Sequence, residues 1–117
     1  MAQSYRDLIA WQKSMELVAA IYRESKTFPS DERFGLISQI RRSAVSVPSN
    51  IAEGEGRKSN GEFRQFLRTA AGSLAEVETQ LTIAGMLGYL PARRVDELLL
   101  CTSEIGRIIN GLIAAKR

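Results

Sequence analysis

The stretch that decides the fold is SNGEFRQFLRTAAGSLAEVETQLTIA, residues 59–84. It opens with Ser59 followed three residues later by Glu62, the pattern of a capping box at a helix start. The apolar residues after it keep helical steps of three and four: Phe63, Phe66, Leu67, Ala70, Leu74, Val77, Leu81 and Ala84. The pattern predicts an amphipathic helix over about 60–87. We expect Gly88 to end it and Gly72, in its middle, to allow the close approach of another helix.

Three further segments carry the same helical period, at about 7–26, 31–53 and 91–115. Asp7 is the expected N-cap of the first, Ser30 caps the second, and Pro91 suits the first turn of the last. In the first segment, the face expected to be buried is Leu8, Trp11, Met15, Val18 and Tyr22, widened by Ile9, Leu17 and Ile21. In the second, it is Phe34, Ile37, Ile40, Ala44, Val47 and Ile51. In the last, it is Val95, Leu98, Leu99, Thr102, Ile105, Ile109 and Leu112.

The predicted fold class is therefore all-α, because no stretch alternates with the period of a strand. Short connections favour antiparallel neighbours, which gives an up-down-up-down four-helix bundle in a single domain over residues 1–117. Pro48 lies inside the second helical pattern, where it cannot donate to the carbonyl of Ala44, so we expect a kink there.

A stripe of small polar residues, Ser43, Ser46 and Asn50, runs beside the apolar face of the second helix. Buried hydroxyls and amides need hydrogen-bond partners, and either another helix of this chain or another subunit can supply them. The apolar stripes are also wider than a two-position seam, which leaves apolar surface that one thin bundle does not cover. We therefore expect a homo-oligomer, with these three residues and Gly72 as candidate bundle or oligomer contacts.

Composition argues against most kinds of catalysis. The chain has no histidine, which removes Ser-His-Asp and Cys-His catalysis and histidine ligation of metals. No two acidic residues are three or four positions apart, so no helix stacks a pair of carboxylates; a site built from single acids on several helices stays open. We predict no enzymatic activity, no catalytic residue, no cofactor and no metal. The single cysteine, Cys101, flanks the last apolar seam and is interpreted as a packing residue.

The cellular location of the protein is also predicted from the composition of the sequence. One cysteine cannot form an internal disulfide, which suits a reducing compartment, and no secretory signal pattern opens the chain. The longest stretch without a charge, residues 79–92, is too short to span a bilayer. The sequence therefore predicts a cytoplasmic protein with no membrane role.

Positive charge is concentrated in the middle of the chain. The net charge is +3, but residues 33–68 alone hold seven basic and three acidic residues. The candidate nucleic-acid-binding residues are Arg41, Arg42, Arg57, Lys58, Arg64 and Arg68. Arg57 and Lys58 precede the third helix, whose first backbone amides can hold a phosphate. The competing interpretation is a solvated helix face that binds nothing.

Some segments resemble a known family. VPSNIAEG, residues 47–54, looks like its signature segment; Glu62-Phe63, Phe66-Leu67 and residues 71–76 are similar to the segment that follows, and Leu8, Trp11, Gln12 and Lys13 match its opening helix. This is the bacterial four-helix-bundle family that includes proteins encoded in 23S ribosomal RNA intervening sequences, to which the accessory variability protein of diversity-generating retroelements is related.

The resemblance implies a ring-like homopentamer, a cytoplasmic location and no enzymatic activity. For the retroelement relatives it implies binding of RNA or DNA and of a reverse transcriptase through a basic surface. Two hypotheses follow for this chain. It is an oligomeric bundle that binds nucleic acid, or a structural scaffold that binds a protein partner without nucleic acid.

Overall fold

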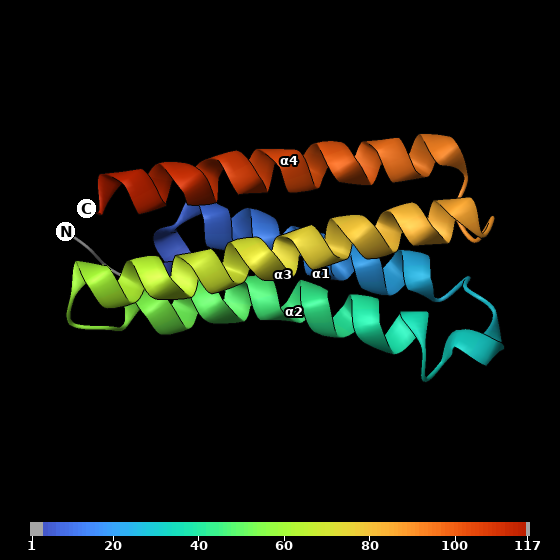
Figure 1. The fold of residues 1–117 in the computed structure, drawn as a ribbon, viewed down its shortest axis with the longest axis horizontal. Coiled ribbons are helices and arrows are strands. Elements are labelled where there is room, and N and C mark those ends of the chain that lie inside the picture. Colours follow the sequence, from blue (N-terminus) through green and yellow to red (C-terminus); the bar gives the residue numbers. More distant parts are fainter. Residues whose placement is uncertain (1–3, 117) are drawn as a thin grey trace.

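Four α-helices lie side by side in the computed structural model, which describes residues 4–116. They are α1 (Ile9–Ser25), α2 (Leu36–Glu55), α3 (Asn60–Met86) and α4 (Ala92–Ala115), with 3-10 turns η1 (Tyr5–Asp7) and η2 (Ser30–Glu32). Successive helices run in opposite directions along the long axis (Figure 1) of a body measuring 44 × 25 × 20 Å. No strand occurs among residues 4–116, so the predicted all-α four-helix fold is confirmed.

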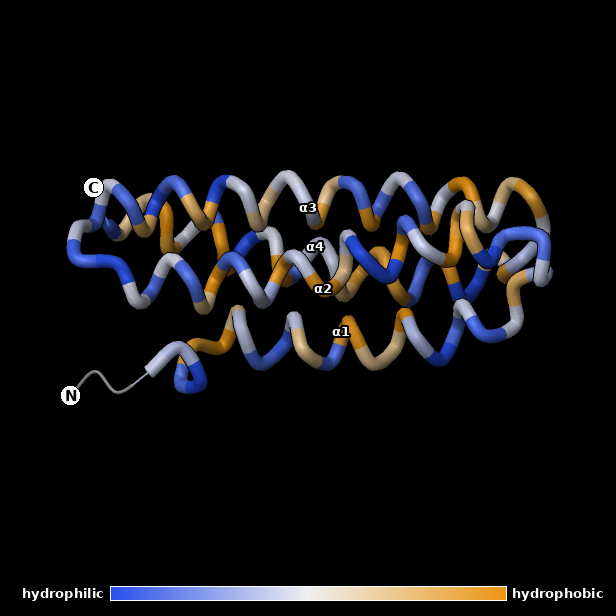
Figure 2. Tube along the Cα trace, turned by 90° about the horizontal axis from the view of Figure 1, so that it is seen from below, coloured by the Kyte–Doolittle hydropathy of each residue, from blue (hydrophilic) through white to orange (hydrophobic). Residues whose placement is uncertain are grey.

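The core lies along the bundle axis, where the apolar seams of all four helices meet. Figure 2 shows hydrophobic and hydrophilic segments alternating along every helix, as expected where one face of each is buried. Among neighbouring helices, α2 and α3 pack most extensively, and α1 and α4 least. The largest side chains that are almost completely buried are Ile21, Ile40, Ile51, Leu67, Leu81, Leu98, Ile105 and Ile109. Each contributes roughly 1.5–3 kcal/mol by leaving water.

Helix α1 begins later and faces the core differently than the sequence suggested. Ser4, not Asp7, is the capping residue, and it caps the separate turn η1. The buried face of α1 is formed by Ala10, Ser14, Leu17, Ile21 and Ser25. Of the expected stripe, Met15 and Tyr22 are 44% and 40% exposed. The expected Leu17 and Ile21 are buried, and Leu8, Trp11 and Val18 pack partly buried against the core, whereas Met15 and Tyr22 lie largely outside it.

The start of α2 was also predicted too early. Ser30 belongs to η2, and the carboxylate of Glu32 caps α2 by accepting the backbone N–H of Leu36 at 2.9 Å. Gly35 makes this possible, because a Cβ there would lie 2.7 Å from Glu32 Oε1. Phe34 falls outside the helix and is 89% exposed, so its expected burial is wrong.

Glu32 also joins the two connections at this end of the bundle. The hydroxyl of Tyr89 donates to Glu32 Oε2 at 2.9 Å, and the Tyr89 ring lies 5.5 Å from that of Phe28. The hydrogen bond from Leu36, and then that from Tyr89, lower the pKa of Glu32. The same bond to Glu32 raises the pKa of Tyr89, because it favours the protonated phenol.

Close helix packing depends on Gly54, not on Gly72. A Cβ at Gly54 would lie 2.6 Å from Phe66 Cβ, whereas one at Gly72 would meet nothing within 4 Å. The expected helix approach at Gly72 is therefore wrong within the subunit, and an oligomer contact there stays a prediction. Gly88 ends α3 as expected: its φ is +78°, and the Tyr89 N–H donates to the Ala84 carbonyl in a Schellman motif. Pro48 is buried inside α2, and the kink expected there stays a prediction.

Helix α4 meets the length and hydropathy of a membrane span, and the expected absence of a membrane role stays a prediction. It has 24 residues and an 18-residue window of mean hydropathy 1.4, so by length and composition it is able to cross a membrane. It is the one such helix among residues 4–116, and 22% of that window is buried in the bundle. Counting only uncharged stretches missed α4, because isolated charges such as Glu104 interrupt its apolar sequence. A core helix of a bundle meets the same criterion, since its apolar seam raises the mean hydropathy.

Candidate nucleic-acid interface

The α2–α3 turn carries two of the predicted cations. Arg57 and Lys58 are exposed and lie between the end of α2 and the start of α3. The hydroxyl of Ser59 accepts the Glu62 backbone N–H at 3.1 Å, which is one half of the predicted capping box. The Glu62 carboxylate accepts from the Ser59 hydroxyl at 3.2 Å and not from the Ser59 backbone N–H, so the other half is not formed. The turn therefore holds both cations beside the N-terminal end of α3, where the helix dipole favours an anion.

Lys116 brings a further cation to this end, which is also the end of α4 (Figure 1). Arg64 Nη1 donates to the Lys116 carbonyl, and Lys116 Nζ lies 5.7 Å from the centre of the Phe63 ring. A hollow of about 290 Å³ is lined here by Arg57, Lys58, Lys116, Ser59, Asn60, Phe63, Ser4, Leu8, Asp7 and Glu55. Lys116 lies outside the basic middle of the chain, so the charge pattern does not point to it, although antiparallel helices place the end of α4 beside the start of α3.

Nearby carboxylates reduce the charge of this hollow. Arg57 Nη2 donates to Glu53 Oε2 at 2.5 Å, and its guanidinium lies 4.8 Å from the centre of the Phe66 ring. Asp7 and Glu55 line the same hollow as the cations. Within residues 4–116, Lys58 and Arg68 make no ion pair. Of the two cations in the turn, Lys58 is therefore the one whose charge is not offset by an ion pair within residues 4–116.

Arg64 contacts Lys116 at this end, but Arg41, Arg42 and Arg68 do not line the hollow, so the six candidates do not form one surface. Arg41 Nε donates to the hydroxyl of Ser25 at 2.8 Å, and its guanidinium lies 4.5 Å from the centre of the Tyr22 ring, so it ties α2 to the end of α1. Arg42 is exposed on α2, about 20 Å along the helix from Arg57. Arg68 is exposed on α3.

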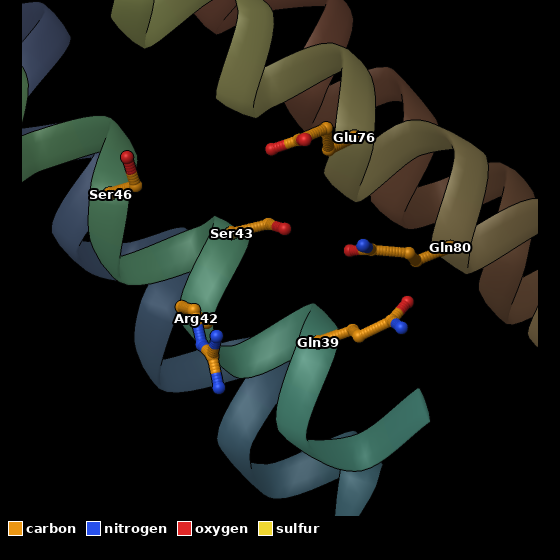
Figure 3. Close-up of a pocket in the computed structure, with 6 residues that line it drawn as sticks. All are labelled: Gln39, Arg42, Ser43, Ser46, Glu76 and Gln80. Carbon is orange, nitrogen blue, oxygen red and sulfur yellow. The ribbon is translucent and has the colours of Figure 1, made fainter. Parts of the chain in front are cut away.

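A second hollow, of about 450 Å³, lies between α2 and α3 (Figure 3). It is lined entirely by polar residues: Gln39, Arg42, Ser43, Ser46, Glu76 and Gln80. We call it the α2–α3 pocket. Its lining includes two of the three small polar residues singled out from the sequence.

These small polar residues find partners mainly within the chain. The hydroxyls of Ser46 and Ser73 lie 2.8 Å apart, which joins α2 to α3. Asn50 Nδ2 donates to the carbonyl of Ser46 at 2.8 Å and to its hydroxyl at 2.9 Å. Ser43 is only 8% exposed and forms no side-chain hydrogen bond with any residue from 4 to 116. Ser46 therefore has its hydrogen-bond partner on another helix of the same chain, whereas the Ser43 hydroxyl has no such partner among residues 4–116.

The residues tested for catalysis show no assembled site. Cys101 is exposed and lines a hollow of about 220 Å³ between α1 and α4, so its predicted packing role is wrong. Lys13 Nζ lies 3.4 Å from Glu104 Oε1, and Arg94 Nε lies 2.5 Å from Glu24 Oε2, which joins the two helices beside this hollow. Over residues 4–116, no group of three histidine, cysteine or acidic side chains is placed to hold a metal ion.

Comparison with known proteins identifies the family. A family model described as 23S rRNA-intervening sequence protein matches residues 6–111. The chain belongs to this family. The match confirms the resemblance seen in the segment 47–54 and covers all four helices apart from the last turn of α4.

A solved structure shares the fold. It is the crystal structure of a protein of unknown function from the S23 ribosomal protein family of Bacteroides thetaiotaomicron. The two chains are 24% identical with a TM-score of 0.83, and the alignment covers 90% of this chain and 98% of that one. A search of curated proteins found no match. At this identity the likeness shows the four-helix fold and does not assign an activity.

Proposed function

We propose that this 23S rRNA-intervening sequence family protein is a non-enzymatic, self-associating bundle that binds nucleic acid with the cations at its α2–α3 turn. The observation that carries the proposal is the convergence of Arg57, Lys58 and Lys116 on one hollow beside the N-terminal end of α3. Cationic side chains and the first amides of a helix both favour phosphate oxygens. The Arg64–Lys116 hydrogen bond holds the end of α4 in place for this contact.

One subunit offers few phosphate contacts, so self-association is part of the proposal. Repeating the turn in an oligomer multiplies weak contacts through effective concentration. A surface suited to self-association lies on the outside of α1 and α2, where a hollow of about 370 Å³ is lined by Tyr5, Trp11, Met15, Val18, Val45, Pro48, Ser49 and Ala52. Lone subunits rarely expose clustered apolar side chains of this kind. The homopentamer implied by the family resemblance is one arrangement that would bury it.

Salt-dependent binding tests the proposal. Labelled single-stranded RNA and duplex DNA are titrated with the protein by fluorescence anisotropy at 50 and 200 mM salt, with subunit number measured by light scattering. We expect binding that weakens with salt because released counterions supply much of the affinity. Lys58→Ala combined with Lys116→Ala should weaken binding to both ligands, and Lys26→Ala, an exposed lysine at the opposite end, is the matched control. No binding at 50 mM salt refutes the proposal.

A second function, protein-partner binding, is favoured by a different observation. Met86 and Leu87 are 80% and 54% exposed at the end opposite the α2–α3 turn. A scaffold would bury these side chains against a partner, for which the resemblance to retroelement proteins suggests a reverse transcriptase. Replacing both with serine should then abolish a stoichiometric complex with the purified partner while leaving nucleic-acid binding intact. Retention of the complex would remove this candidate.

A further inference from the structure

The lining of the α2–α3 pocket includes groups of opposite charge from two helices. Arg42 and Gln39 come from α2, whereas Glu76 and Gln80 come from α3. Figure 3 shows Gln80 and Glu76 reaching from α3 toward α2, with Ser43 pointing back toward Gln80 and the Arg42 side chain directed away from α3. The pocket volume, about 450 Å³, lies in the usual range of sites for small organic groups.

One buried side-chain oxygen in the pocket has no partner among residues 4–116. Gln80 Oε1 is buried and accepts no hydrogen bond from residues 4–116. The Ser43 hydroxyl, on a residue only 8% exposed, is likewise unpaired over the same residues. A buried side-chain oxygen in a folded protein nearly always has a partner, so Gln80 Oε1, aimed into the pocket beside the Ser43 hydroxyl, points to a ligand that donates hydrogen bonds.

We infer that the α2–α3 pocket binds a guanine base of a single-stranded nucleic acid, which rests on the proposed function. Guanine presents the acceptors O6 and N7 on one edge, which the forked guanidinium of Arg42 matches. Its neighbouring edge carries N1–H and an N2 amino group, which donate to the carboxylate of Glu76. Gln80 Oε1 and the Ser43 hydroxyl can take the remaining amino proton or a ribose hydroxyl.

The side chains that make the base contacts are free to move. Arg42 is exposed, and its one hydrogen bond within residues 4–116 is a contact of 3.5 Å with Ser38, so its guanidinium can turn into the pocket. Glu76 is exposed and makes no ion pair in the described chain. Uracil lacks the paired acceptors O6 and N7, and adenine carries a donor where guanine carries O6, so both match the pocket less well.

Base preference, not affinity alone, tests this inference. Labelled oligouridine and the same oligomer with one central guanine are titrated with the full chain by fluorescence anisotropy. We expect the guanine oligomer to bind about tenfold more tightly, in line with one well-matched base contact. Glu76→Gln should reduce this ratio to about one while oligouridine binding is kept or slightly strengthened, because a negative charge is lost. Glu16→Gln, an exposed carboxylate on α1, is the matched control and should keep the ratio.

A spectroscopic readout locates the contact. In NMR spectra of the folded protein, the side-chain amide signals of Gln39 and Gln80 should shift with guanosine monophosphate and not with cytidine monophosphate. Equal binding of both oligomers overturns the guanine site and leaves the proposed function standing, whereas loss of all binding removes both. Shifts of these amides with protein concentration alone show a second copy in the pocket and overturn the inference. Circular dichroism confirms that each variant is folded.

Discussion

Replacing Gly54 with alanine should destabilise the bundle, whereas the same change at Gly72 should stabilise it. Both glycines lie inside helices, where alanine is favoured over glycine by about 1 kcal/mol. The new Cβ at Gly54 would lie 2.6 Å from Phe66 Cβ and 3.0 Å from Phe63 Cδ1. Phe66 Cβ is fixed to the backbone of α3, so relief requires the two most extensively packed helices to separate.

The expected magnitudes follow from these contacts. Overpacking costs about 1–3 kcal/mol, and contact with a backbone-anchored atom belongs in the upper half of that range. After the helix-propensity gain, Gly54→Ala should lower the free energy of unfolding by about 1–2 kcal/mol, and Gly72→Ala should raise it by about 0.5–1 kcal/mol. For 117 residues, 1 kcal/mol corresponds to about 4 °C in Tm.

Thermal unfolding followed by circular dichroism at two protein concentrations provides the assay. Gly54→Ala should lower Tm by about 4–8 °C, and Gly72→Ala should raise it by about 2–4 °C. An increase in Tm for Gly54→Ala would refute the reasoning that this glycine sets the α2–α3 distance. A decrease for Gly72→Ala that depends on protein concentration would instead place Gly72 in an oligomer contact, as the sequence suggested.

Three more predictions address other contacts. The hydrogen bonds to Glu32 lower its pKa from 4.5, so they stabilise the fold above pH 4.5, and this stability is lost as pH falls through the lower pKa of the folded state. Glu32→Gln should therefore flatten the acid limb of a plot of Tm against pH. An unchanged acid limb would contradict this. Ser46→Ala or Ser73→Ala should each cost about 1 kcal/mol, with the double variant costing less than the two single costs together, as measured by urea unfolding; strict additivity would mean that the 2.8 Å contact contributes nothing. Met15→Lys with Val45→Lys should reduce the subunit number measured by light scattering while helical content is kept, because both side chains line the outer α1–α2 hollow; an unchanged subunit number would place the interface elsewhere.

Periodicity predicts the helices because apolar residues recur at three- and four-residue spacing in every one of them. It does not determine which of the apolar residues in a wide stripe point toward the core. In α1, large apolar residues dominate the pattern, so the sequence favours the stripe through Met15 and Tyr22. The core also receives Ala10 and Ser14, which that stripe omits, together with Leu17 and Ile21 at its edge, because α1 packs against both α2 and α4. The direction of a wide stripe depends on neighbouring helices, which a single helix does not reveal.

The candidate site was predictable in part, for a similar reason. The α2–α3 turn and the Ser59 cap are local features, so the sequence located Arg57 and Lys58 correctly beside the start of α3. Whether distant cations share a surface depends on helix rotation. Arg41 and Arg42 are adjacent in sequence, yet Arg41 reaches Tyr22 on α1 and Arg42 lines the α2–α3 pocket. The pairing of Lys116 with Arg64 spans 52 positions and required the antiparallel topology.

The placement of Ser4 and Lys116 around one hollow has a practical consequence for handling this protein. Any affinity tag or fluorescent fusion joined ahead of Ser4 or behind Lys116 leaves the bundle next to Lys58, where its bulk or charge competes for the surface under study. The connection between Met86 and Ala92 lies at the far end (Figure 1), more than two dozen helical residues away. A short internal epitope inserted there would report on the molecule without touching the basic turn.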